Sequence, residues 1–191
     1  LYTPYIEFPT SDRRRTGILF PEFGTSSSRG LELGVPWYWN IAPEQDMLLT
    51  PTAMERRGLN LDGNYRFLTE STYGELKGSY LPDDKVNGED RYQVRYQQRT
   101  NLAQDVLLEA DLQDISDSNY FNDFANSLGT TSQTHLDRNI KLAYALTDWK
   151  FNALLQDIKS IDESRPISTR PYARLPQLTA AGSQQLMSSP I

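Results

Sequence analysis

The chain has 191 residues, 38 % of them hydrophobic, and a formal net charge of −6 at pH 7. This negative charge argues against nucleic acid as a partner, and the absence of cysteine excludes disulfides and thiolate metal sites. No apolar run reaches the length of about 18 residues that a transmembrane helix needs, but the short alternating strands of a membrane barrel would leave no such run.

Aromatic residues are frequent in this polar chain, whose mean hydropathy is −0.60. Its 11 tyrosines, 7 phenylalanines and 3 tryptophans favour amphipathic β-strands over disorder. Because the chain opens at Leu1, which is neither a start methionine nor part of a signal peptide, we expect it to be a piece of a longer protein.

Residues 1–30 are predicted to be irregular, because prolines interrupt their short apolar runs. Five arginines are candidate phosphate ligands, since a guanidinium fork matches phosphate oxygens. They are Arg13, Arg14, Arg15, Arg56 and Arg57. The alternative is that these arginines are charges at a membrane edge or in a barrel lumen.

The stretch from Gly34 to Pro51 is predicted to be a β-hairpin, with its turn at residues 42–45. If that turn is centred between Pro43 and Glu44, Pro36 faces Pro51 across the hairpin. A proline cannot donate to a ladder and belongs at edges or bulges, so the hairpin is predicted to be a sheet edge or a weak seam.

From Leu31 onward, apolar and polar residues alternate, which predicts about eight strands of roughly ten residues and no helix. One face is apolar, with aromatics near strand ends, and the other carries many charged and amide side chains. This pattern is typical of antiparallel transmembrane strands, with lipid outside and a wet lumen inside; a soluble sandwich is the alternative. Loop lengths favour the short turns on the inner side of the membrane.

Candidates for chemistry are few, and we predict no catalytic site, metal site or cofactor. His135 is the only histidine, and the loop acids Asp83-Asp84 and Glu89-Asp90 are placed as if to solvate a turn, though they could be read as glycosidase carboxylates. Residues 114–119 lack the glycine and glutamate of a calcium loop. Trp37 and Trp39 form either an interfacial aromatic belt or a sugar platform.

Several segments in order resemble the outer-membrane lipopolysaccharide-assembly family LptD. They are PYIEFP, RRRTGILFPEFG, PWYWNIAPEQD, TPTAMERRG, NYRFLT, YLPDD and SNYFNDF. The matches run from about Tyr2 to Phe124, and Trp37 departs from them, since the family usually has tyrosine there.

The resemblance implies an all-β fold of antiparallel strands that form the N-terminal part of a large transmembrane β-barrel of the bacterial outer membrane. Residues 1–30 would be the end of a periplasmic jelly-roll domain and a linker, and residues 31–191 the first strands of the barrel. The implied function is transport of lipopolysaccharide into the outer leaflet through a lateral gate, with Pro36 and Pro51 matching the prolines of the family's gate strands. The implied partners are the lipoprotein plug LptE and the periplasmic bridge protein LptA.

Two other functions stay open from the residues alone. One is a soluble or small-barrel carbohydrate-binding module that uses the tryptophans as a platform, and the other is a glycosidase built on the loop acids. The membrane interpretation makes two further structural predictions. The alternating aromatic and aliphatic residues should lie on one face and Arg66, Arg95, Glu109 and Lys141 on the other, and Tyr120, Phe121 and Phe124 of the loop 116–134 should be tucked in.

Overall fold

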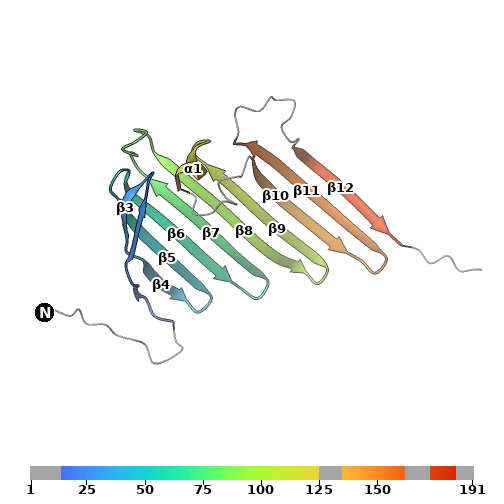
Figure 1. Cartoon of the computed structure of the whole chain (residues 1–191). Coiled ribbons are helices and arrows are strands. Elements are labelled where there is room, and N and C mark those ends of the chain that lie inside the picture. Colours follow the sequence, from blue (N-terminus) through green and yellow to red (C-terminus); the bar gives the residue numbers. More distant parts are fainter. Residues whose placement is uncertain (1–13, 125–134, 162–172, 184–191) are drawn as a thin grey trace, which may run out of the picture.

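A computed structural model describes residues 14–124, 135–161 and 173–183 of the chain. Within these residues the chain forms one sheet of twelve strands and one short helix, α1 (Tyr120–Phe124) (Figure 1). The strands are β1 (Gly17–Ile18), β2 (Glu22–Ser26), β3 (Gly30–Gly34), β4 (Trp37–Ala42), β5 (Gln45–Met54), β6 (Gly58–Leu68), β7 (Thr72–Leu81), β8 (Arg91–Ala103), β9 (Val106–Ile115), β10 (His135–Ala145), β11 (Trp149–Ser160) and β12 (Arg174–Gly182).

The sheet is antiparallel and open, and from β4 to β12 each strand pairs with the next one in the chain. The all-β, antiparallel fold class is therefore confirmed. The prediction of about eight strands of roughly ten residues is confirmed by β5 to β12, which have 9 to 13 residues each. Residues 1–30, which were predicted to be irregular, contain the short strands β1 and β2. The prediction of no helix is wrong: α1 has only five residues, too few for a helical periodicity to reveal it.

The first strands of the sheet form an unusual edge. Strand β3 pairs with the end of β5 and β4 with its beginning, so that one edge of β5 is covered by a strand interrupted at Val35 and Pro36. Outside this broken strand, β2 pairs with β3 and β1 pairs with β4. The division of the chain at residue 30 stays a prediction.

The long connections lie at one end of the sheet, and the described connections at the other end are all short turns (Figure 1). The turns β4–β5, β6–β7, β8–β9 and β10–β11 define the turn end. The β2–β3 and β5–β6 turns, the β7–β8 loop and the β9–β10 connection with α1 define the loop end.

Strand register confirms the two faces predicted from alternation. Trp39 pairs with Met47, which pairs with Tyr65, and this row continues through Leu76 to Tyr96. The predicted apolar set shares that side, which we call the outer face: Val35, Trp37, Trp39, Tyr65, Phe67, Val94, Tyr96, Leu108, Leu142 and Tyr144. Arg66, Arg95, Glu109 and Lys141 lie on the opposite, inner face.

Two glycines let aromatic rings lie flat against the backbone. A Cβ atom on Gly74 would come within 2.4 Å of the Phe67 ring, and one on Gly182 within 2.6 Å of the Trp149 ring. Each ring therefore covers the glycine of the neighbouring strand, an arrangement that protects a glycine-weakened ladder.

Burial is concentrated at the loop end, whereas large apolar side chains of the outer face are exposed, among them Leu61, Leu142 and Trp149. A small core of Ile115, Tyr120, Phe121, Leu136 and Ile161 seats helix α1 on the ends of the strands. The prediction that Tyr120 and Phe121 are tucked in is confirmed, and Phe124 packs against the same core while half-buried. No helix in the described part of the chain is long and apolar enough to cross a membrane.

Candidate functional site

The hairpin of β4 and β5 differs from its predicted register by one residue. At the turn Ala42 pairs with Gln45, as predicted, but a bulge at Ile41 shifts the pairing before Asn40. Trp37 then pairs with Leu49, and Gly34 with Thr52, in the same register. The prediction that Pro36 faces Pro51 is therefore wrong: Val35 lies opposite Pro51, and Pro36 lies opposite Thr50.

The bulge has a physical reason. A slip of one residue moves every side chain to the other face. Trp37, Trp39 and Ile41 in β4 and Met47 and Leu49 in β5 all stand at odd-numbered positions. Without the bulge, Trp37 and Trp39 would share a face with Thr50 and Leu48 and not with Leu49 and Met47. The extra residue lets the two apolar sets share the outer face.

Both prolines use their carbonyl groups as acceptors. Pro51 accepts from the Val35 amide at 3.1 Å, and Pro36 accepts from the Leu19 amide at 2.8 Å. In an antiparallel strand the N–H and C=O of one residue point to the same side. Pro51 therefore leaves the ladder inside the hairpin without one N–H donor, and Pro36 leaves the outer edge of β4 without one.

This outer edge is weakly paired. Among the described residues, β1 pairs with β4 at Gly17 and Ile18, and Leu19 and Thr16 add single bonds to Pro36 and Asn40. By contrast, β5 pairs with β6 along its whole length from Gln45 to Met54. Of the two ladders that lack a proline donor, the one along the outer edge of β4 is therefore the shorter, and the seam stays a prediction.

The outer face carries its aromatics in stacked pairs near the turn end. Trp37 and Trp39 have ring centroids 5.6 Å apart, and Tyr65 and Phe67 are 5.8 Å apart. The part of β6 from Leu59 to Phe67 is about 26 Å long at about 3.3 Å per residue, or about 20 Å high at the usual tilt of barrel strands. This is close to the apolar band of an outer-membrane barrel, with the stacked rings at one border.

Charged groups mark the other border of the apolar band, at the loop end. Asp114 lies opposite Val94 on the outer face. It forms ion pairs with Arg138 at 2.8 Å and Lys159 at 2.6 Å. Arg138 also contacts Asp157 at 3.2 Å. A charged cluster would be costly inside the hydrocarbon, so this one fits the level of the headgroups.

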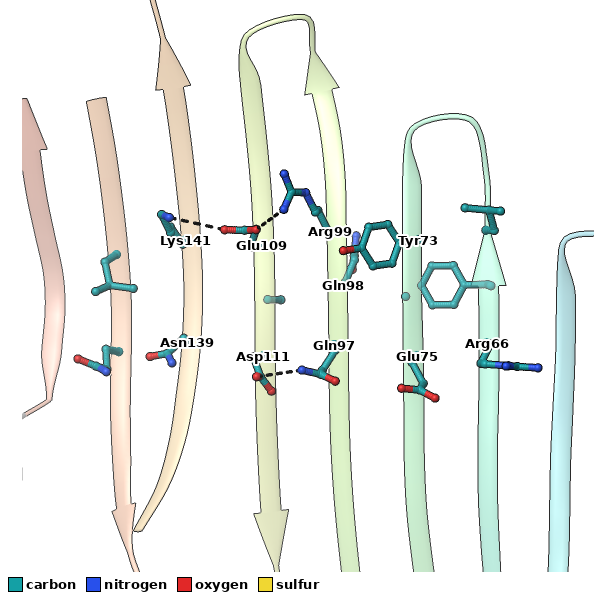
Figure 2. A pocket seen from close by; sticks show the side chains of 16 residues that line it. Arg66, Tyr73, Glu75, Gln97, Gln98, Arg99, Glu109, Asp111, Asn139 and Lys141 are labelled. Carbon is teal, nitrogen blue, oxygen red and sulfur yellow. Dashed lines mark hydrogen bonds and ion pairs between the residues drawn. The ribbon is translucent and has the colours of Figure 1, made fainter. Parts of the chain in front are cut away.

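The inner face carries a continuous row of polar side chains from β5 to β11, in strand register. The row consists of Asp46, Arg66, Glu75, Gln97, Asp111, Asn139 and Gln156. Arg66 binds Asp46 with two bonds of 2.8 Å, and Gln97 donates to Asp111 at 3.1 Å. A second, shorter row joins Arg99, Glu109 and Lys141 at 3.1 and 3.6 Å (Figure 2). All members of the two rows except Asp46 line an open hollow of about 830 Å³, together with apolar residues such as Leu68 and Leu154. The side chains of the rows offer charges and amides to a polar partner there.

Three of the five candidate phosphate-binding arginines contact other groups of the protein. Arg13 lies outside the described residues, and Arg15 is exposed. Arg14 contacts Asp46 at 3.2 Å, and Arg56 donates to the carbonyl of Ser27. The side chain of Arg57 is only 4 % exposed and binds acidic groups described next. These contacts favour the alternative of lumen or edge charges, and a phosphate role stays a prediction.

A buried ion cluster at the loop end was not predicted from the sequence; it contains two arginines and three aspartates. Arg57 contacts Asp84 at 2.6 Å and Asp123 at 3.0 Å. Arg91 contacts Asp84 at 3.3 Å, Asp117 at 2.8 Å and also Asp123. The side chains of Asp84 and Arg91 are 0 % and 2 % exposed. The three carboxylates come from two different loops, so only the fold reveals the cluster.

Aromatic rings cover the two guanidinium groups of this cluster. The Phe124 ring lies 5.0 Å from the guanidinium of Arg57 and 4.8 Å from that of Arg91, and Tyr120 lies 5.6 Å from that of Arg91. Burial alone would raise the pKa of Asp117, but hydrogen bonds from Arg91 and Ser116 and the charge of Arg91 outweigh it and lower that pKa. Burial raises the pKa of Tyr120.

The remaining chemical candidates have structural surroundings. Asp84 belongs to the ion cluster, and Asp90 accepts from the Tyr80 hydroxyl at 2.7 Å and the Asp83 amide at 3.0 Å. His135 is an exposed residue at the start of β10. Among the described residues, no three histidine, cysteine or acidic side chains form a group that could hold a metal.

An open sheet with an apolar outer face and a polar inner face has the architecture of a membrane β-barrel wall. Residues 89–190 match the family model LptD, described as LPS transport system D, so the chain belongs to the LptD family. The chain is 42 % identical over 179 residues to the LPS-assembly protein LptD of Alkalilimnicola ehrlichii. This alignment covers 94 % of the chain and 23 % of that protein.

Two further relatives give the same result. The LPS-assembly protein LptD of Legionella pneumophila (strain Lens) is 36 % identical over 95 % of the chain and 24 % of its own length. That of Shewanella frigidimarina is 38 % identical over 93 % of the chain and 23 % of its own length. The chain thus spans about a quarter of the length of the curated relatives it matches. The resemblance noted in the sequence is confirmed.

Proposed function

We propose that this chain is the first part of a barrel wall in the bacterial outer membrane, and that the barrel transports lipopolysaccharide to the outer leaflet. The single observation that carries this proposal is the two-faced sheet of an LptD-family chain whose first full strands end at a weakly paired edge. The division into a periplasmic segment, residues 1–30, and a barrel segment, residues 31–191, belongs to the same proposal.

The outer edge of β4 is the proposed lateral gate. A closed barrel has no free edge, so a lipid can leave sideways only where the ladder opens. Pro36 removes one donor from this edge, and within the part of the chain that the structure describes β1 supplies two paired residues there. Each missing backbone bond forgoes roughly 0.5–1.5 kcal/mol, which makes this edge the least costly place to open.

The polar inner face is the proposed contact surface for the polar partners. The row from Asp46 to Gln156 faces the lumen, where the lipoprotein plug LptE would lie, and the N-terminal segment would meet the periplasmic bridge protein LptA. This function needs no covalent chemistry from the chain. The stacked tryptophans of the outer face serve as an interfacial belt in this proposal.

The test is made in cells that depend on the full-length protein. Replacement of Pro36 and Pro51 together by alanine adds up to two donors and should hold the gate shut, which lowers surface lipopolysaccharide and admits large antibiotics at normal protein level. Pro43→Ala in the β4–β5 turn is the control, since this proline lies outside the proposed seam. Surface lipopolysaccharide equal to that of the control would show that the prolines have no gating role. Extraction of the protein into buffer without detergent would instead favour the soluble carbohydrate-binding alternative.

A further inference from the structure

We propose that contacts made by helix α1 hold the β2–β3 hairpin against the sheet, and we call this set of contacts the latch. The latch depends on the proposed function only for the statement that the adjoining edge is a gate. It consists of the ion cluster, the small apolar core and the tip of the hairpin. Figure 1 shows α1 at the loop end of the sheet.

One side of α1 is anchored by apolar contacts. Tyr120 and Phe121, each 4 % exposed, pack with Ile115 at the end of β9, Leu136 in β10 and Ile161 after β11. Apolar burial of this kind has no direction and is lost only when the whole helix leaves. This side therefore fixes the position of the helix on β9–β11.

The other side of α1 reaches the hairpin through polar contacts. The hydroxyl of Ser28 donates to the carbonyl of Asp123 at 3.1 Å, and Arg29 donates to the carbonyl of Phe124 at 3.1 Å. Both residues belong to the β2–β3 turn, about 95 positions earlier in the chain. These bonds are few and directional, so small movements of the hairpin break them while the apolar anchor stays intact.

The β5–β6 turn also forms hydrogen bonds with the tip of this hairpin. Arg57 donates to the carbonyl of Ser28 at 3.1 Å, and Arg56 donates to the carbonyl of Ser27. Glu55 accepts from the Leu31 amide at 3.0 Å. Because Arg57 also contacts Asp123 at 3.0 Å, one guanidinium connects the hairpin, the β5–β6 turn and α1.

The hairpin continues directly into the proposed gate strand. After β3 the chain passes through Val35 and Pro36 into β4, and Pro36 interrupts the edge between them. An open hollow of about 570 Å³ lies on the inner face between the hairpin and α1, lined in part by Glu22, Glu32 and Asp62. A hairpin tip released from α1 thus has room to move while β3 stays paired with β5 at residues 32–34, and we expect its movement to reach β4 through Val35 and Pro36.

The latch is tested by hydrogen exchange, measured in detergent on the full-length protein in complex with the lipoprotein plug LptE. Asp123→Asn keeps the size of the side chain but removes the charge that Arg57 and Arg91 share. Corrected exchange of the peptides covering residues 22–34 should rise about tenfold, the factor that corresponds to about 1.4 kcal/mol, while β8 is unchanged. Asp157→Asn is the matched control, because Asp157 contacts Arg138 at the same end without touching the hairpin.

A second variant changes a residue of the hairpin that contacts α1. Ser28→Ala removes the hydroxyl that donates to the carbonyl of Asp123, and together with Asp123→Asn its effect on exchange should be less than additive, because both variants open the same contact. Exchange in residues 22–34 equal to wild type, or raised equally in β7, β8 and β9, would overturn the latch.

The link to the gate has its own measurement. Cells that carry Asp123→Asn should admit more of a large antibiotic than cells that carry Asp157→Asn. Raised exchange without raised entry would overturn this link, and it would do so whatever the double proline variant shows about lipopolysaccharide.

Discussion

The carbonyl oxygen of Pro51 accepts a hydrogen bond from the amide nitrogen of Val35 at 3.1 Å. This contact carries the register of β3 across the break into β4, and it leaves the second bond of the Val35–Pro51 pair unmade. Pro36 is directed the other way, with its carbonyl bound to Leu19. The two prolines therefore weaken different ladders, one inside the hairpin and one along its outer edge.

The single proline variants should accordingly differ. Pro36→Ala adds a donor to the outer edge of β4 and should reduce surface lipopolysaccharide. Pro51→Ala adds its donor toward Val35 within the hairpin and should mainly stabilise the hairpin, by roughly 0.5–1.5 kcal/mol. Quantified surface lipopolysaccharide and thermal unfolding of the purified protein measure the two effects. Equal loss of surface lipopolysaccharide in both variants would contradict the assignment of separate ladders.

The period of two was sufficient to predict the faces of the sheet but not the register at Ile41. A turn of known length suggests one register, and only the agreement of Trp37 and Trp39 with Met47 and Leu49 on one face reveals the bulge. That apolar agreement was present in the sequence and could have predicted the extra residue.

The polar inner face was partly predictable and the ion cluster was not. Arg66, Arg95 and Glu109 alternate with apolar neighbours, so their common face follows from local pattern. Arg57, Asp84 and Asp123 lie on three separate connections, whose meeting depends on how the long loops fold back. No local period records such a contact.

The two faces can be tested at neighbouring positions of β10. Leu142→Lys places a charge on the outer face between Ile140 and Tyr144 and should cost about 2–4 kcal/mol of folding in a bilayer if it lies near the midplane. Ala143→Lys places the same charge on the inner face, beside Lys141, and should have little effect. Folded fractions of the full-length protein in lipid vesicles at increasing urea give both values. A similar loss in both variants would mean that neither face is in contact with lipid.

Gly74 should not tolerate a side chain. A Cβ there would approach the Phe67 ring to 2.4 Å and the carbonyl of Gln97 to 2.9 Å, so Gly74→Ala should displace the ring and strain the β7–β8 ladder, at about 1–3 kcal/mol. Gly78→Ala on the same strand and face is the control, because its nearest atom is 3.7 Å away. Thermal unfolding of both variants measures the difference, and equal melting temperatures would show that the ring is not held against Gly74.

Acid should loosen the loop end through Asp117. Hydrogen bonds from Arg91 and Ser116 lower its pKa in the folded protein against the opposing effect of burial, and Asp84 and Asp123 contact the same guanidinium. A carboxyl whose folded pKa is lowered stabilises the fold above its unfolded pKa of about 3.9, and this contribution is lost as the pH falls through the lower, folded value. Exchange of the peptides covering residues 116–124, corrected for the intrinsic rate, should therefore increase below about pH 4. Asp117→Asn should show raised exchange already at pH 7 and a smaller further increase in acid; an unchanged acid response in this variant would assign the titration to another group.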